Sequence, residues 1–332
     1  MKHYKQLALA FILLMSACRK DDSALITEKT PPSALSVNAI GLWEEKANFA
    51  SERAYSVAFS IDGKGFIGLG TAQEEAINDF WMYNPADNSW TCKASFPGLR
   101  RTAAVGFSIG KKGYAGTGYS NINQGISLKD FWEYSPETDC WTRKADFPGT
   151  ARFAAVGFSI GDKGYIVTGS IGQTDSNYLW EFDSKTNTWT RKADFPSEAR
   201  QYAVAFTIGM KGYLGTGISL NGDKNDFWEY SQSTDQWVKK ASFAGSIRHS
   251  AAGFTIGDLG YLGTGVSNFN DDNKDLWEYN PVTDKWLQKA DFQGQARFAA
   301  TGLSIGSKGY IGFGTQSVPT TNLSDFWQFT AN

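Results

Sequence analysis

The sequence predicts an all-β protein in which six similar four-stranded sheets close into a ring, a β-propeller, and three observations lead to this prediction. A step of Lys, Gly and an aromatic residue recurs at intervals of 48 to 51 residues, with Leu259 in place of Lys in one copy. An aromatic segment containing Trp recurs with it, and five of the six copies carry a second Trp nine residues later. The last copy ends before its fourth strand, while an unmatched fourth-strand segment precedes the first copy. The steps begin at Lys64, Lys112, Lys163, Lys211, Leu259 and Lys308, the first Trp residues are Trp81, Trp132, Trp180, Trp228, Trp277 and Trp327, and the second are Trp90, Trp141, Trp189, Trp237 and Trp286.

The first 18 residues have the composition of a secretion signal. Lys2 and Lys5 precede a short apolar run over 7–15, and small residues lead to Cys18. The run is too short to span a bilayer. Its ending, LLMSAC, resembles a bacterial lipobox, which implies cleavage before Cys18 and attachment of lipid to the Cys18 sulfur. A plain secretory signal with an incidental cysteine is the alternative.

Residues 19–40 have the composition of a flexible tether, because they mix charges with Ser, Thr and a Pro-Pro pair and show no sustained period. The charged run Arg19-Lys20-Asp21-Asp22 resembles the signal that sends lipoproteins of Bacteroidetes-like bacteria to the outer leaflet of the outer membrane. We therefore expect a protein of the bacterial cell envelope, either on the outward face of the outer membrane or in the periplasm. The membrane would be contacted through the lipid anchor only.

One repeat, over residues 101–147, contains four strand-like segments. The first two segments, RTAAVGFSIG and YAGTG, are rich in small residues. The third, DFWEYS, places its side chains alternately on two faces. Trp141 begins the fourth strand. Both faces of such a sheet are largely apolar, so each sheet needs a neighbour on either side. The repeated Trp residues are expected to fill the space between neighbouring blades. A row of platforms for stacking sugars is the alternative.

The ends of the chain predict how the ring closes. The segment LWEEKANF at 42–49 matches the fourth strand of the other repeats, and the sixth repeat stops at DFWQFTAN without a fourth strand. The N-terminal strand should complete the last blade, which would remove an open sheet edge. The predicted propeller therefore covers residues 41–332.

The repeat resembles the Kelch repeat in its glycine step, its aromatic third strand and the Trp nine residues further on. The resemblance covers nearly the whole chain after residue 41. The chain departs from the Kelch glycine doublet, because it has Gly116-Thr117-Gly118 in the second copy and Val167-Thr168-Gly169 in the third. The resemblance implies a propeller similar to the central domain of galactose oxidase and to N-acetylneuraminate epimerase.

Composition argues against several kinds of function. The formal net charge is −2 and no basic cluster stands apart from acidic residues, so nucleic acid is not an expected partner. There are two His residues, and His3 lies in the signal, so an imidazole-based copper or zinc site lacks ligands. Copper oxidase chemistry is therefore argued against, and neither a metal nor a cofactor is expected. His249 and Ser250 are adjacent on a strand and point to opposite faces, which makes a catalytic triad improbable. Cys92 and Cys140 are expected to be free thiols.

The connections between second and third strands differ in length and chemistry, whereas the other turns are uniform, so binding is expected on the face that carries these variable loops. An Arg stands 11 residues before each glycine step, on the same face. Six free guanidinium groups there would attract an anion. The favoured alternative is a set of Arg-to-Asp bridges, because five repeats have an Asp just before the third strand. The arginines are Arg53, Arg101, Arg152, Arg200, Arg248 and Arg297, and the acids are Asp79, Asp130, Asp226, Asp275 and Asp325.

The third repeat has Tyr178 where the others have Asp. Either Arg152 or Arg200 should then lack a partner and be the best candidate for holding a ligand carboxylate. The residue after each Arg varies, and together with two tyrosines these positions should line the mouth of the channel as a mixed aromatic and polar surface. A bland rim that fills the top of the channel is the alternative. The candidates are Ala54, Thr102, Phe153, Gln201, His249 and Phe298, with Tyr55 and Tyr202.

Two functions fit these patterns. The first is a non-catalytic binding module that presents its variable loops to a glycan or a protein. The second is a sugar-converting enzyme similar to N-acetylneuraminate epimerase, since mutarotation needs only a positioned acid and base. An acidic residue outside the repeated Asp set, placed beside an Arg that has no partner, would favour the enzyme.

Overall fold

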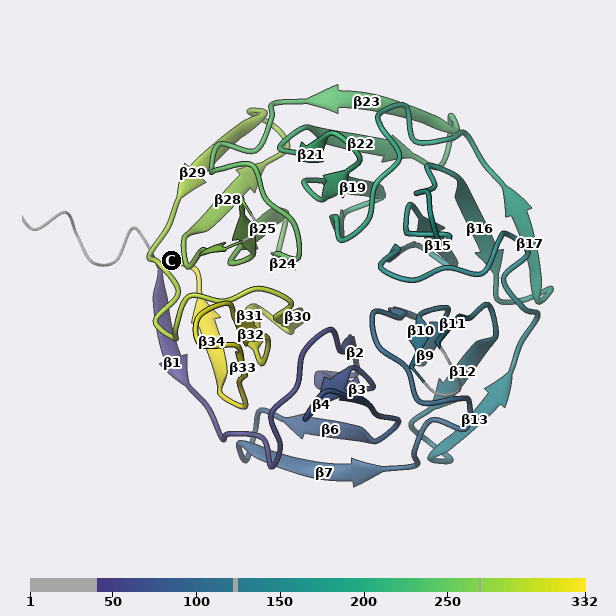
Figure 1. Cartoon of the computed structure of the whole chain (residues 1–332), viewed down its shortest axis with the longest axis horizontal. Coiled ribbons are helices and arrows are strands. Elements are labelled where there is room, and N and C mark those ends of the chain that lie inside the picture. The colour runs from purple at the N-terminus through teal and green to yellow at the C-terminus, as the bar shows by residue number, and fades with distance from the viewer. Residues whose placement is uncertain (1–40, 122–124, 269) are drawn as a thin grey trace, which may run out of the picture. The chain divides into compact units, whose positions relative to one another are not determined.

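The computed structural model describes residues 41–121, 125–268 and 270–332. The signal peptide, Cys18 and the tether, over 1–40, lie outside the described residues. Within the described part, the main strands form six four-stranded antiparallel sheets arranged around a central axis (Figure 1). The prediction of an all-β, six-bladed propeller is confirmed.

Each blade consists of four antiparallel strands, placed one after another from the central axis to the rim. The blades are numbered in chain order. The innermost strands are β2 (Val57–Ile61), β8 (Val105–Ile109), β14 (Val156–Ile160), β18 (Val204–Ile208), β24 (Ala252–Ile256) and β30 (Thr301–Ile305). The second strands are β3 (Lys64–Gly68), β9 (Lys112–Gly116), β15 (Lys163–Val167), β19 (Lys211–Gly215), β25 (Leu259–Gly263) and β31 (Lys308–Gly312). The third strands are β6 (Phe80–Asn84), β12 (Phe131–Ser135), β16 (Leu179–Asp183), β22 (Phe227–Ser231), β28 (Leu276–Asn280) and β34 (Phe326–Thr330). The outermost strands are β7 (Ser89–Lys93), β13 (Cys140–Arg143), β17 (Thr188–Arg191), β23 (Gln236–Lys240), β29 (Lys285–Gln288) and β1 (Leu42–Glu45).

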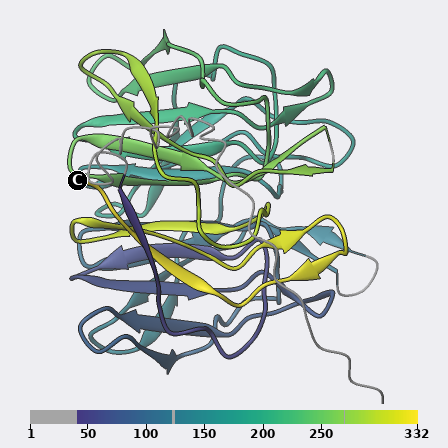
Figure 2. The ribbon, with the colours of Figure 1, turned by 90° about the vertical axis from the view of Figure 1, so that its left-hand side faces the viewer.

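The outermost strand of the sixth blade is β1, which comes from the beginning of the described chain. It pairs antiparallel with β34, with Trp43 opposite Phe329. Figures 1 and 2 show this purple strand beside the yellow strands from the end of the chain. The indole of Trp43 donates a hydrogen bond to the carbonyl of Ala290 (3.1 Å), and its ring lies 5.0 Å from the rings of both Phe292 and Phe329.

Neighbouring blades are held together by aromatic packing and by indole hydrogen bonds. Between the first two blades, for example, Phe80 and Tyr134 are completely buried in one core cluster, and Trp141 packs against it. Nε1 of each outer-strand Trp donates to an Ala carbonyl of the preceding blade at 2.8 to 3.1 Å. The prediction that the repeated Trp residues fill the space between blades is confirmed for this outer set, which comprises Trp43, Trp90, Trp141, Trp189, Trp237 and Trp286.

The variable connections carry small two-stranded ribbons in five of the six blades. In the third blade a single bridge between Ser170 and Asp175 stands in the same place. The ribbons are β4 (Thr71–Ala72) with β5 (Glu75–Ala76), β10 (Tyr119–Ser120) with β11 (Ile126–Ser127), β20 (Ile218–Ser219) with β21 (Gly222–Asp223), β26 (Val266–Ser267) with β27 (Asp271–Asp272), and β32 (Thr315–Gln316) with β33 (Thr321–Asn322). A search of the described residues found no helix with the length and apolar character needed to cross a bilayer.

Candidate functional site

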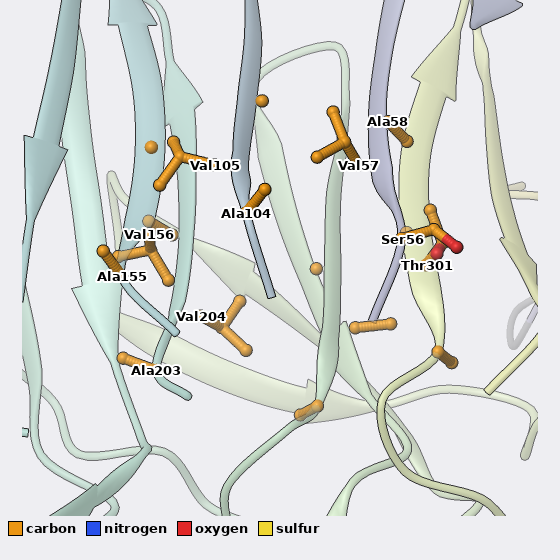
Figure 3. Close-up of a pocket in the computed structure, with 18 residues that line it drawn as sticks. Ser56, Val57, Ala58, Ala104, Val105, Ala155, Val156, Ala203, Val204 and Thr301 are labelled. Carbon is orange, nitrogen blue, oxygen red and sulfur yellow. The ribbon is translucent and has the colours of Figure 1, made fainter. Parts of the chain in front are cut away.

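The central channel is narrow and built from small residues. It contains a cavity of about 170 Å³, lined by three consecutive residues from each innermost strand region. Figure 3 shows lining residues such as Ser56, Val57 and Ala58. The lining residues are Ala, Gly, Val, Ser and Thr, and they include no titratable side chain. A charged or acid–base site therefore has to lie outside this part of the channel.

A closed ring of backbone hydrogen bonds surrounds the channel on the variable-loop side. Each of six equivalent residues donates its N–H to the carbonyl of its counterpart in the preceding blade, at 2.8 to 3.2 Å, and the first blade is joined to the sixth. All six have φ between 50° and 55°, although none is a glycine. Such a conformation persists only where the surrounding structure enforces it, so the rim of the channel is firmly held. The residues are Tyr55, Ala103, Ala154, Tyr202, Ser250 and Ala299.

Two tyrosines of this ring meet over the channel. Tyr55 belongs to the first blade and Tyr202 to the fourth, and their ring centroids are 5.3 Å apart. They lie over a cavity of about 120 Å³. Burial raises the pKa of both hydroxyl groups further above neutral pH, and both groups can donate hydrogen bonds. Phe298 lies 6.4 Å from Tyr55 and His249 lies 6.2 Å from Tyr202, so four of the predicted mouth residues form one aromatic cluster.

A pocket of about 580 Å³ opens beside this cluster, between the variable loops of the first and sixth blades. Two aromatic rings, two carboxylates, an amide pair and several threonine hydroxyls line it. This combination offers flat apolar surfaces next to hydrogen-bonding groups, as sugar-binding sites do. The lining residues are Glu52, Ala54, Tyr55, Thr71, Gln73, Glu74, Phe298, Thr315, Thr320, Thr321 and Asn322.

Three other predicted mouth residues do not line this pocket. Thr102 accepts a hydrogen bond from the hydroxyl of Thr71 (2.8 Å). Phe153 packs against Tyr119, with centroids 5.4 Å apart. The side-chain oxygen of Gln201 is buried and has no hydrogen-bond partner among the described residues.

An acid–base pair that the repeat pattern does not predict lies near the mouth. Nδ1 of His249 lies 2.7 Å from Oδ1 of Asp223, whose side chain is 4% exposed. The other oxygen of Asp223 accepts the backbone N–H of Asn268 (3.1 Å). Asp223 comes from a ribbon of variable sequence, so no repeat pattern pointed to it. It lies outside the repeated Asp set, and its hydrogen bonds are to His249 and Asn268 rather than to Arg152.

The structure contains the Arg-to-Asp bridges. All six arginines are buried, and five of them bond to the Asp that precedes the third strand. Arg101 is typical, because its Nη1 and Nη2 each lie 2.7 Å from one oxygen of Asp130. Its carbonyl accepts a hydrogen bond from Gly70 of the preceding blade (2.9 Å), so the residue links two blades. The alternative expectation, that six free guanidinium groups surround the channel mouth, is therefore wrong. The five bridged arginines are Arg53, Arg101, Arg200, Arg248 and Arg297.

The exception is Arg152. Arg200 pairs with Asp226, so among the described residues it is Arg152, of the two candidates, that has no carboxylate partner. Its Nε and Nη1 donate to the carbonyls of Thr150 (3.2 Å) and Thr168 (2.8 Å). The ring of Tyr178 lies over the guanidinium group of Arg191 instead, 3.8 Å away. Burial lowers the pKa of Arg152 to about 10.

The described residues contain no cluster of three or more His, Cys, Asp or Glu side chains that could hold a metal ion. Cys92 and Cys140 are both exposed free thiols in the structure. This agrees with the expectation that Cys92 and Cys140 are free thiols.

The fold defines the class: the protein is a six-bladed β-propeller, and its repeats resemble the Kelch repeat. Over 77 residues it is 40% identical to N-acetylneuraminate epimerase of Pasteurella multocida (strain Pm70), a match that covers 21% of this chain and 20% of that protein. It also superimposes on the solved structure of YjhT with a TM-score of 0.73 at 16% identity, over 85% of this chain and 95% of that one. No family model matches the sequence. The chain thus matches about a fifth of the length of the curated relative, and the likeness to YjhT shows the fold alone.

Proposed function

We propose that this protein is a non-catalytic propeller that binds a glycan in the pocket between the variable loops of its first and sixth blades. The observation that carries the proposal is the pairing of Tyr55 and Phe298 in one pocket with Glu52, Glu74 and polar side chains of the loops. Aromatic faces pack on the apolar faces of sugar rings, while carboxylates and amides accept or donate hydrogen bonds to hydroxyl groups. The pocket volume of about 580 Å³ lies within the usual range of small-molecule sites.

The test is a glycan array probed with the full chain, followed by affinity measurements on the glycan that binds. Removing either ring, by Tyr55→Ala or Phe298→Ala, should weaken binding at least tenfold, which corresponds to about 1.4 kcal/mol. Phe153→Ala is the matched control, because Phe153 is a mouth residue outside this pocket. Equal affinity in Phe298→Ala and wild type would reject the pocket, and a protein captured by the same face in the absence of any glycan would favour a protein partner instead.

The proposal includes anchoring in the bacterial cell envelope by lipid on Cys18, with residues 19–40 as the tether. It is supported by the LLMSAC ending and the charged run that follows it. Metabolic labelling with palmitate should mark the wild-type chain, and labelling should be lost in Cys18→Ala.

A second candidate is a sugar-converting enzyme, and one observation favours it. The buried pair of His249 and Asp223 lies beside Tyr202, and a carboxylate that orients an imidazole is a common acid–base device. The relative from Pasteurella multocida carries the name of an epimerase of N-acetylneuraminate. Faster equilibration of N-acetylneuraminate anomers with the wild-type chain than with His249→Ala would support this candidate over the binding module.

A further inference from the structure

The third blade contains two hydrogen-bond donors at a position where every other blade holds a carboxylate. In the second blade, Oδ2 of Asp130 accepts from Nη2 of Arg101 (2.7 Å) and from Nε1 of Trp132 (2.8 Å). The same indole bond, at 2.8 to 2.9 Å, occurs in the first, fourth, fifth and sixth blades. The propeller thus builds the same carboxylate-binding notch repeatedly, from one guanidinium group and one indole.

In the third blade both donors are present, but the acceptor is not. Arg152 is 1% exposed, and within the part of the chain that the structure describes its hydrogen bonds are made by Nε and Nη1. Nε1 of Trp180 is buried and has no acceptor among the described residues. Two carbonyls and the ring of Phe147, 4.7 Å away, contact the Arg152 guanidinium group, but no carboxylate among the described residues balances its charge. Burying a charge without a counter-charge is unfavourable, and so is burying an N–H group without an acceptor.

Two features beside the notch are the same in the third blade as in other blades. The amide of Asn177 donates to the carbonyl of Phe195 (3.1 Å), as the amide of Asn78 donates to Phe96 in the first blade (3.2 Å). Trp180 pairs with Arg191 as Trp132 pairs with Arg143 in the second blade.

The notch is accessible from solvent in the blades where a carboxylate fills it. The bridging Asp side chains are 17% to 35% exposed. In the sixth blade Asp325 lines an open pocket of about 410 Å³ together with Gly294 and Trp327. Gly149 is the third-blade counterpart of Gly294, and a Cβ atom there would come within 3.0 Å of Nη2 of Arg152. A side chain at this position would therefore crowd the guanidinium group, and the glycine avoids that contact.

We propose that Arg152 and Trp180 form a binding site for the carboxylate group of a ligand, on the variable-loop face of the third blade. The ligand carboxylate takes the place that the Asp carboxylate has in the other blades, with one oxygen shared between Nη2 of Arg152 and Nε1 of Trp180. Tyr178 leaves this place to the ligand, because its ring lies on Arg191, which Asp194 in turn neutralises (2.8 Å). The site is built from different residues than the glycan pocket, so it goes beyond the proposed function and stands or falls separately from it.

The test follows the indole N–H resonances of the full chain by NMR, in chloride-free buffer at constant ionic strength. Acetate, glucuronate and chloride are titrated in turn, and Trp180→Phe assigns the signal of Trp180. Acetate or glucuronate should shift the Trp180 signal saturably, while the signal of Trp132, whose N–H already bonds to Asp130, should stay in place. Tighter binding of glucuronate than of acetate would identify a sugar acid as the source of the carboxylate, and the reverse order a small free acid.

The matched variant is Tyr178→Asp, which supplies the protein's own carboxylate as in the other five blades. Tyr178→Asp should weaken the affinity for acetate, measured from the shift of the Trp180 signal, at least tenfold. Tyr178→Phe should leave this affinity unchanged. No saturable shift of Trp180 with either carboxylate would overturn the proposal. An equal response of Tyr178→Asp, or saturation by chloride at the same concentration as by acetate, would overturn it as well.

Discussion

Each blade buries one guanidinium group, and the blades differ in whether a carboxylate of the protein is paired with it. Five of them are neutralised by the protein's own Asp, and Arg152 is not. The sequence alone could predict this series and its break at Tyr178, because the repeats align residue by residue. It could not predict that Trp180 shares the same acceptor position, or that Tyr178 would lie on Arg191, because both depend on the directions of side chains.

The first prediction at this scale concerns stability. Tyr178→Asp should stabilise the protein by about 1 to 2 kcal/mol, because hydrogen bonds to charged groups are worth about 1.5 to 3 kcal/mol and the exposed cation–π contact with Arg191 that is lost is worth about 0.5 to 1 kcal/mol. The melting temperature should rise by roughly 4 °C in calorimetry. Tyr178→Asn is the control without charge. If Tyr178→Asp melted no higher than Tyr178→Asn, the result would contradict the account.

The gain should depend on pH in a defined direction. In the fourth blade, burial opposes ionisation of Asp226, but the hydrogen bonds and charge of Arg200 outweigh it and lower the pKa of Asp226 to about 2. A carboxylate with a lowered pKa stabilises the folded state above its unfolded pKa of about 4, and this stabilisation is lost as the carboxylate is protonated. The difference in melting temperature between Tyr178→Asp and wild type should therefore shrink as the pH falls from about 4 towards 2.

The strands and their order could be predicted from the sequence, whereas the loops could not. Period-two patterns and the glycine steps recur in every repeat, so the four main strands of a blade are visible in the sequence. The five small ribbons occur in segments of variable length and composition, and residues such as Glu74 and Asn322 enter the candidate pocket through them. A single sequence carries no repeated signal for such positions.

At the scale of the element, β1 should contribute strongly to stability. Trp43→Ala removes the hydrogen bond to Ala290 and the contacts with Phe292 and Phe329, and truncation of a large aromatic side chain costs about 3 to 5 kcal/mol. Glu44→Ala on the same strand is the control, because the Glu44 side chain is 64% exposed and its ion pair with Lys46 is worth at most about 1 kcal/mol. Chemical denaturation measures both, and equal stabilities of the two variants would show that this strand is not needed to hold the sixth blade.

For the whole molecule, residues that recur in every blade hold the ring together, and residues that depart from the repeat form the proposed sites. The repeated indoles and arginines bond between and within blades, and the backbone ring around the channel fixes the rim. Tyr55, Phe298, Asp223 and Tyr178 are all departures from the repeat, and all lie on the variable-loop side. Both proposed sites therefore lie on one face of the ring.

Hydrogen–deuterium exchange of the full chain, with and without the glycan identified on the array, tests this assignment most directly. The account predicts slower exchange in the segments that line the pocket, 52–55, 71–74 and 315–322, and no change in the outermost strands β7, β13 and β17. Slower exchange along those outer strands, where the repeated Trp residues lie, together with no change at the pocket, would contradict it.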